Sequence, residues 1–134
     1  MILDTGILYA LADRSDRHHA AAKRLFLGPG IRIVPEPVVV EVDWLVRERL
    51  GVDAEIAFLA GIASGNPAVE ATAPEDRRRA AEIVAAYRDA EVGYVDAIVV
   101  AMAERLGETV IATVDHRHFR AMRPRHVAAF DLVP

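Results

Sequence analysis

Short runs of apolar residues, separated by longer amphipathic segments, are the main pattern along this chain. The apolar runs end at Gly, Pro or acidic residues and have the length of strands rather than helices. The expected strands cover residues 1–3, 31–34, 69–72, 109–114 and 128–133. They are mostly apolar instead of alternating, which indicates a sheet whose two faces are both covered.

The segments between these runs have the apolar spacing that is typical of amphipathic helices. The expected helices cover residues 6–12, 16–26, 38–50, 53–63, 74–90 and 95–106, with a short helical turn after Asp115. Asp16 and Asp53 are the expected N-caps of two of them, because Asp is favoured at that position. Pro37 suits the first turn of the third helix, and Gly51 and Gly107 suit helix ends.

The alternation of strands and helices predicts an α/β fold around a mostly parallel sheet. The 134 residues suit one domain, which we place at 1–134. In open parallel sheets, ligands bind beyond the carboxyl ends of the strands. Acidic residues at strand ends and at adjoining helix starts are therefore the first candidates for a functional site.

Composition narrows the class of protein. Apolar residues make up 53% of the chain and charged residues 27%, which is typical of a folded globular protein. The absence of cysteine excludes disulfides, thiolate nucleophiles and cysteine-ligated metal sites. The N-terminus lacks the pattern of a signal peptide, and the longest uncharged run, 56–69, is too short for a membrane span. We therefore expect a cytoplasmic protein.

The charge is unevenly distributed along the chain. The formal net charge of −4 argues mildly against nucleic acid as a partner. Two short segments are nevertheless basic: residues 14–24 hold four cations and one acid, and residues 116–126 hold four arginines and no acid. The usual explanation of such a segment is a solvated surface. The whole-chain figure therefore conceals two local positive regions.

Three aspartates stand at the places where this fold positions ligands. Asp4 follows the first expected strand, Asp115 follows the strand at 109–114, and Asp96 begins a very apolar helix. Each also has an ordinary explanation as a turn or helix-capping residue, because Asp is favoured in both places.

Glu41 is harder to explain as an ordinary surface residue. Its helical neighbours at three- and four-residue spacing are Val38, Trp44 and Leu45, which places Glu41 on or beside the apolar stripe. A buried carboxylate is costly unless it is paired, protonated or bound to a metal. The simpler alternative is a boundary residue that reaches solvent or a distant arginine.

If these four carboxylates converge, they repel one another and need a positive partner. A site rich in oxygen and free of sulfur suits hard divalent cations such as Mg²⁺ or Mn²⁺. Two such ions about 3.5–4 Å apart form the arrangement used in phosphodiester cleavage. Histidine ligands are also possible, from His116 and His118, whereas the adjacent His18 and His19 face apart on a helix.

Four sequence blocks resemble the PIN-domain nucleases, and most of all the toxins of VapBC-type toxin–antitoxin pairs. The blocks are residues 2–5, 40–45, 95–103 and 112–119. Residues 13–20 and 123–126 are also similar to these toxins, so the resemblance extends over the whole chain. Some members of the family have an acid near the position that His118 occupies here.

The resemblance implies a three-layer α/β/α sandwich with a short, mostly parallel sheet, and Mg²⁺- or Mn²⁺-dependent cleavage of RNA. It implies that four acids bind metal and catalyse, with two supporting hydroxyls: Asp4, Glu41, Asp96 and Asp115, with Thr5 and Thr113. It also implies a homodimer and a small VapB-type antitoxin that blocks the site. Residues of the basic segments are then candidates for contacts to the RNA backbone, namely Arg14, Arg17, His116, Arg117, His118 and Arg120.

Other functions can be compared with the same residues. The triplet Asp4-Thr5-Gly6 also occurs in aspartic proteases, but that fold is all-β and this chain is dominated by expected helices. Phospho-aspartate receivers and haloacid-dehalogenase-type phosphatases generally need a late lysine, and the only lysine here is Lys23. Two alternatives stay open: a catalytically silent PIN-fold module that binds RNA or a protein partner, and a PIN nuclease outside toxin–antitoxin systems.

Overall fold

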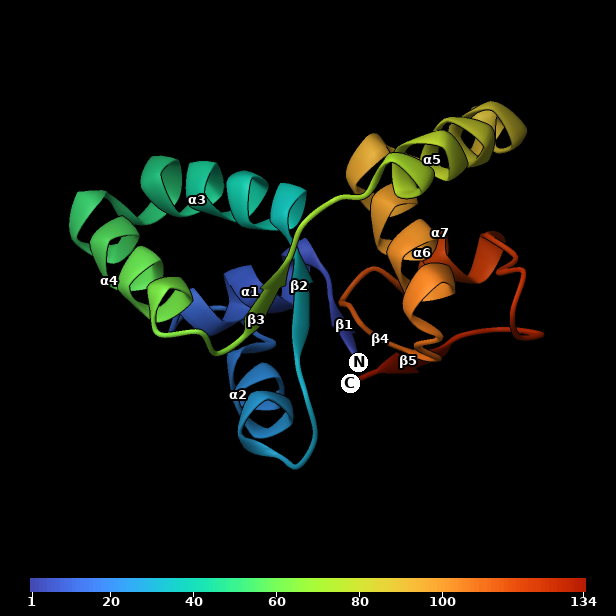
Figure 1. Ribbon diagram of the computed structural model, residues 1–134. Helices are drawn as coiled ribbons and strands as arrows, with labels where there is room; N and C mark the ends of the chain where they lie inside the picture. Colours follow the sequence, from blue (N-terminus) through green and yellow to red (C-terminus); the bar gives the residue numbers. More distant parts are fainter.

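Five parallel strands form the central sheet of the computed structural model, which describes residues 1–134 (Figure 1). The strands are β1 (Ile2–Leu3), β2 (Ile33–Pro35), β3 (Ala68–Glu70), β4 (Val110–Ala112) and β5 (Asp131–Val133). Their order across the sheet is β3-β2-β1-β4-β5, and every neighbouring pair is parallel. The predicted α/β fold is therefore confirmed.

Helices flank this sheet. They are α1 (Thr5–Ala12), α2 (His19–Leu27), α3 (Glu36–Leu50), α4 (Val52–Ala63), α5 (Pro74–Ala86), α6 (Tyr94–Leu106) and α7 (His116–Ala121), with a 3₁₀ turn at Arg88–Ala90. Figure 1 shows α3 and α4 side by side at one end of the molecule and α5 lying along α6 at the other. α6 also packs against β1, the middle strand of the sheet, and against its neighbour β2.

The strand order reverses between β1 and β4, and this reversal positions the candidate site. The chain moves along the sheet in one direction from β1 to β3 and then crosses back past β1 to reach β4. Connections that leave neighbouring strands in opposite directions open a crevice at their carboxyl ends. Leu3 of β1 pairs with Ala112 of β4, so Asp4 and Thr113 follow at the same edge of the sheet.

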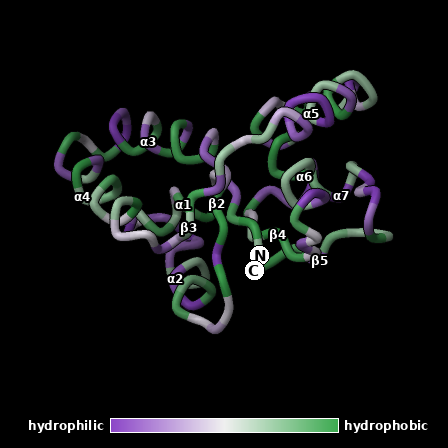
Figure 2. Tube along the Cα trace, viewed as in Figure 1, coloured by the Kyte–Doolittle hydropathy of each residue, from purple (hydrophilic) through white to green (hydrophobic).

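The core consists mainly of aliphatic side chains from the strands and from α1, α3 and α6, with smaller contributions from the other helices. In α6, residues 97–103 are all buried, so this helix is enclosed on all sides. In α3 only one stripe is buried, which consists of Val38, Val42 and Val46. Figure 2 shows hydrophobic residues along the central strands and hydrophilic residues over much of α5. None of the helices combines the length and the apolar character needed to cross a lipid bilayer.

Several element boundaries differ from the predictions. The helix expected to begin at Asp16 begins at His19, because Asp16 closes a turn in which its Oδ1 accepts a hydrogen bond from the His18 N–H at 2.7 Å. Asp53 lies in the first turn of α4, and Gly51 occupies the N-cap position instead. α5 ends at Ala86 and is followed by the separate 3₁₀ turn, so the single helix predicted over 74–90 was wrong in its last turn.

Gly6 allows α1 to pass close to Val114, the second residue after β4. A Cβ at Gly6 would overlap with Val114 Cγ2. We expect Gly6→Ala to lower the free energy of unfolding by about 1–3 kcal/mol, because overpacking forces neighbouring side chains out of their rotamers. Chemical denaturation measures this change.

Gly61→Ala in α4 is the matched control for that substitution. A Cβ at Gly61 meets no atom within 4 Å, so the gain in helix propensity is expected to raise stability by about 0.5–1 kcal/mol. Effects of the same sign and size at both positions would contradict the close-approach argument.

Candidate active site

The four predicted acids come from separate parts of the chain to the carboxyl ends of β1 and β4. Asp4 directly follows β1, and Asp115 lies just beyond β4. Asp96 lies in the first turn of α6, and Glu41 lies in the second turn of α3. The charges of Asp96 and Glu41 raise the pKa of Asp4, and those of Glu41 and Asp115 raise the pKa of Asp96. The four carboxylates are therefore electrostatic neighbours.

Asp4 is the most deeply buried member of this group, with 5% of its surface exposed. Its backbone N–H donates to the Ala112 carbonyl at 2.9 Å, and its Oδ2 accepts from Thr113 Oγ1 at 2.8 Å. Its other oxygen, Oδ1, is buried and has no hydrogen-bond partner. Burial is the main cause that raises the pKa of Asp4 to about 6, and the Thr113 hydrogen bond opposes it.

The hydroxyls of Thr113 and Thr5, the two predicted supporting residues, form hydrogen bonds within the group of acids. Thr113 is fully buried; its hydroxyl donates to Asp4 and accepts from the Asp115 N–H at 2.9 Å. Thr5 Oγ1 donates to Glu41 Oε2 at 2.5 Å. Thr113 thus links Asp4 and Asp115 through its two hydrogen bonds. Thr5 follows Asp4 in the chain, so its hydrogen bond to Glu41 links Glu41 to the Asp4 segment.

A histidine lies between the other two acids. Nδ1 of His118 is 3.5 Å from Asp96 Oδ2 and 3.4 Å from Asp115 Oδ2. Asp115 also caps α7, since its Oδ1 accepts from the Arg117 N–H at 3.1 Å. Burial raises the pKa of Asp96 most strongly, and His118 opposes that shift. His118 is therefore the residue of the two basic segments whose side chain lies against these acids.

Glu41 is exposed, so of the two predicted places, on or beside the apolar stripe, it occupies the second and is not a buried carboxylate. The buried stripe of α3 repeats every four residues through Val38, Val42 and Val46, and Glu41 lies beside it. Trp44, expected on the same buried stripe, is 62% exposed. The capping role considered for Asp96 also does not hold, because Gly93 is the N-cap of α6. What holds Glu41 at the site is the Thr5 hydroxyl.

The remaining predicted residues have looser relations to the acids. Arg117 and Arg120 are exposed on α7, on the element that also carries His118, and His116 is partly buried there. Arg14 and Arg17 are exposed in the segment between α1 and α2, where Arg17 Nε donates to His18 Nε2 at 2.9 Å.

The donor chemistry of the acids fits a hard divalent cation. All four offer carboxylate oxygens, and Asp4 Oδ1 is a buried oxygen that no protein group satisfies. Buried anions that repel one another are stabilised by a cation between them. No group of three or more His, Asp or Glu side chains is arranged to hold a metal ion as the structure stands. The arrangement is thus a set of neighbouring donors rather than a closed coordination site.

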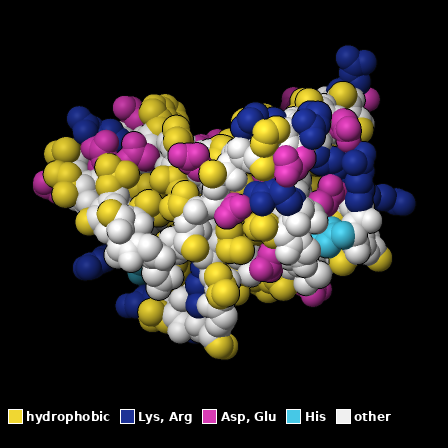
Figure 3. Space-filling model, viewed as in Figure 1, with side chains coloured by type: hydrophobic (Ala, Val, Ile, Leu, Met, Phe, Trp, Pro, Cys, Tyr) yellow, Lys and Arg dark blue, Asp and Glu magenta, His cyan; other side chains and the backbone are white.

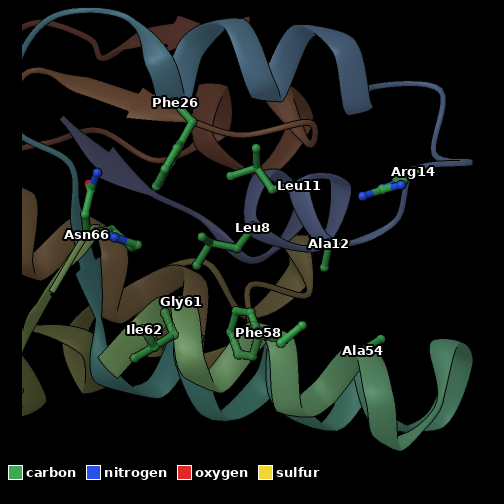
Figure 4. A pocket seen from close by; sticks show the side chains of 12 residues that line it. Leu8, Leu11, Ala12, Arg14, Phe26, Ala54, Phe58, Gly61, Ile62 and Asn66 are labelled. Atoms are coloured by element: carbon green, nitrogen blue, oxygen red, sulfur yellow. The ribbon is translucent and has the colours of Figure 1, made fainter. Parts of the chain in front are cut away.

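An apolar groove, absent from the predictions, lies between α1, α2 and α4 (Figure 4). It has a volume of about 420 Å³, and Leu8, Phe26 and Phe58 line its middle. Arg14 and Asn66 lie at opposite ends of it in Figure 4. Its walls come from the consecutive helices α1 and α2 and from α4, about 30 residues later, and no spacing pattern within one helix could have indicated it.

The model of the PIN domain family matches residues 1–123 of this chain. The chain belongs to the PIN-domain family. The resemblance in the sequence blocks is therefore confirmed over nearly the whole chain, and the acids described above lie in the matched part.

This PIN domain is a homologue of VapC-type ribonuclease toxins. It is 38% identical over 135 residues to Ribonuclease VapC26 of Mycobacterium tuberculosis, and the match covers 100% of both chains. Because the identity extends over both full lengths, the homology concerns the whole of this chain.

Solved structures share the fold of this PIN domain. The crystal structure of Mycobacterium tuberculosis VapC20, described as a sarcin–ricin loop cleaving toxin, superposes with a TM-score of 0.83 at 26% identity, covering 95% of this chain and 98% of that one. VapBC2 from Rickettsia felis, bound to a promoter DNA fragment, gives a TM-score of 0.72 at 12% identity, covering 99% of this chain and 98% of that one. FitAcB from Neisseria gonorrhoeae gives 0.68 at 17% identity, covering 97% and 96%. The latter two likenesses concern the fold alone.

Proposed function

We propose that this PIN domain is a metal-dependent endoribonuclease, the toxin of a VapBC-type toxin–antitoxin pair, which hydrolyses RNA phosphodiesters with a water molecule activated in the acid cluster. The observation that carries the proposal is the group of acids around Asp4. There, a buried carboxylate oxygen without a partner lies among three further acids at the crevice between β1 and β4. The protein would act in the cytoplasm, where RNA substrates are present.

Asp4 and Asp96 would hold Mg²⁺ or Mn²⁺ most directly, since they are the two acids whose pKa is raised by burial. Glu41 and Asp115 would complete the set. When bound, such an ion supplies positive charge that polarises water and the phosphodiester. Neutralising the mutual repulsion of the acids would also keep Asp4 and Asp96 ionised at neutral pH.

The chain's own residues would then position the reactants. Glu41, the exposed acid held by Thr5, is placed to orient or deprotonate the attacking water. Thr113 would keep Asp4 and Asp115 in fixed relation through its two hydrogen bonds. The cations and histidines of the basic segments would contact the RNA backbone. Among them, Arg117 and Arg120 share helix α7 with His118, which lies against the acids.

The apolar groove between α1, α2 and α4 fits the proposed antitoxin. Aliphatic and aromatic side chains line it, and the exposed Arg14 at one end would pair with an acidic side chain of the bound segment. Apolar residues of α3 and α4 are also exposed, among them Val40, Trp44 and Ile56, and Figure 3 shows hydrophobic side chains gathered on this part of the surface. The homodimer that the family resemblance implies stays a prediction.

A cleavage assay on defined RNA tests the proposed activity. Because VapC20 is described as a sarcin–ricin loop cleaving toxin, a hairpin with that loop is the first substrate, and a hairpin with a scrambled loop is its control. We expect cleavage with Mg²⁺ or Mn²⁺, its loss with EDTA, and recovery when Mn²⁺ is added in excess. Cleavage of both hairpins would support the ribonuclease activity and contradict specificity for this loop.

The alternatives give different results in that assay. RNA binding without cleavage in either metal would indicate a catalytically silent PIN module. Metal-dependent cleavage that no small protein encoded beside the gene inhibits would indicate a PIN nuclease outside toxin–antitoxin systems.

A further inference from the structure

The contact between α6 and α7 brings a nitrogen donor into the acid cluster. Nδ1 of His118 lies 3.5 Å from Asp96 Oδ2 and 3.4 Å from Asp115 Oδ2. Both distances are longer than the 2.7–3.2 Å that is usual for an N–H···O hydrogen bond. The imidazole therefore faces two carboxylate oxygens at nearly equal distance without a normal hydrogen bond to either.

The buried oxygen of Asp4 is a second, independent indication that this cluster takes a ligand. Asp4 is 5% exposed, and its Oδ1 has no hydrogen-bond donor. The charge of Asp96 acts on Asp4, so the unsatisfied oxygen and the histidine belong to one electrostatic neighbourhood. Buried polar atoms are nearly always satisfied in folded proteins, and a missing ion is one of the ordinary explanations of an exception.

We propose that His118 Nδ1 is itself a ligand of the divalent ion in this site, together with Asp96 and Asp115, and that the site therefore prefers Mn²⁺ to Mg²⁺. Mg²⁺ takes oxygen ligands almost exclusively, whereas imidazole suits transition metals. A nitrogen in the donor set consequently shifts the preference toward Mn²⁺. This inference rests on the proposed function in one respect: the ion bound by His118 is the divalent cation that the ribonuclease would use.

The spacing of the three side chains agrees with this role. As the structure stands they do not close around a common point. The charge of Asp115 acts unfavourably on Asp96, which is the repulsion expected of two carboxylates without a cation between them. A divalent ion removes that repulsion, and only small movements of side chains that are 25%, 52% and 30% exposed would bring Asp96, Asp115 and His118 together.

The competing interpretation is that His118 serves only as a positive partner of the two acids. In that case a bound metal ion would displace the imidazole, and replacing the histidine would leave metal affinity equal or higher. If His118 is a ligand, its replacement lowers Mn²⁺ affinity and leaves Mg²⁺ affinity less affected. The two interpretations therefore predict opposite changes.

Electron spin echo envelope modulation of Mn²⁺ bound to the full chain, without RNA, distinguishes them. We expect a ¹⁴N coupling in the unchanged protein, its loss in His118→Gln with Mn²⁺ still bound, and its persistence in the control His116→Gln on the same helix. Mn²⁺ affinity, from the free-ion signal, should fall about tenfold or more in His118→Gln. His118→Asp should bring the affinities for Mg²⁺ and Mn²⁺, measured by competition, closer together.

The outcomes separate this inference from the proposed function. Mn²⁺ binding that Asp96→Asn abolishes, but with no ¹⁴N coupling, overturns the ligand role and leaves the ribonuclease intact. A ¹⁴N coupling that survives in His118→Gln also overturns it. A coupling assigned to His118 in a protein that cleaves no RNA would uphold the ligand role and overturn the proposed activity. Absence of Mn²⁺ binding would overturn both.

Discussion

Asp4→Asn is expected to lower RNA cleavage by several orders of magnitude while the protein remains folded. Asp4 supplies the most deeply buried carboxylate of the site, and its Oδ1 is free of protein partners. An amide of the same shape can still accept the Thr113 hydrogen bond, but it carries no charge for a divalent ion. Loss of one of the acids that would hold the cation therefore removes the stabilisation of charge on which the reaction depends.

Asp96→Asn is expected to lower the rate of RNA cleavage by a similar factor. The double variant should be only slightly less active than either single variant. Residues that act as a unit in catalysis are strongly non-additive. Asp53→Asn is the matched control, because Asp53 is an exposed acid in the first turn of α4 and lies outside the cluster. Initial rates on the hairpin RNA measure these effects. Full activity in Asp4→Asn would mean that the cleavage arises elsewhere.

The contribution of Asp4 to the stability of the metal-free protein is expected to fall as the pH rises from about 4 to about 6, opposite to the contributions of Asp13 and Glu104, whose pKa values are lowered by hydrogen bonds. The pKa of Asp4 is about 6 in the folded protein, above its ordinary value of 3.8, chiefly because the carboxyl is buried. Between these two values the unfolded chain has released the proton while the folded chain still holds it, so folding becomes less favourable with rising pH. The raised pKa of Asp4 corresponds to a loss of roughly 2–3 kcal/mol in the free energy of unfolding. This loss is absent below about pH 4 and complete above about pH 6. The raised pKa of Asp96 acts in the same direction.

Asp4→Asn is the variant that tests this assignment. It should remove most of the pH dependence and make the metal-free protein more stable than the unchanged protein at neutral pH. Mn²⁺ should raise the melting temperature of the unchanged protein by several degrees at neutral pH, because an ion that binds only the folded state stabilises it. The same addition should have little effect on Asp4→Asn. Thermal unfolding from pH 4 to pH 8, with EDTA or Mn²⁺, measures all of these changes. The same pH dependence of stability in the unchanged protein and in Asp4→Asn would contradict the assignment to Asp4.

Local sequence patterns determined most of the secondary structure and the position of three acids. Apolar runs and helical periodicity predicted the five parallel strands and the helices between them, because burial on both faces leaves a continuous apolar run in a strand. Asp4 and Asp115 could be assigned to one edge of the sheet because parallel strands end at the same edge. Asp96 could be assigned to a helix start from the apolar sequence that follows it.

Only the tertiary structure decided how these groups meet. Glu41 lies beside the buried stripe of α3, and the hydroxyl of Thr5, 36 residues earlier, holds it at the site. Thr113 reaches Asp4 across 109 residues of sequence, and His118 lies between two acids carried by different helices. Such contacts depend on how separate elements pack, and no periodicity within one element contains that information. The sequence therefore determined which acids, hydroxyls and histidines are present. The packing of β1, β4, α3, α6 and α7 determined which of these groups meet in one site.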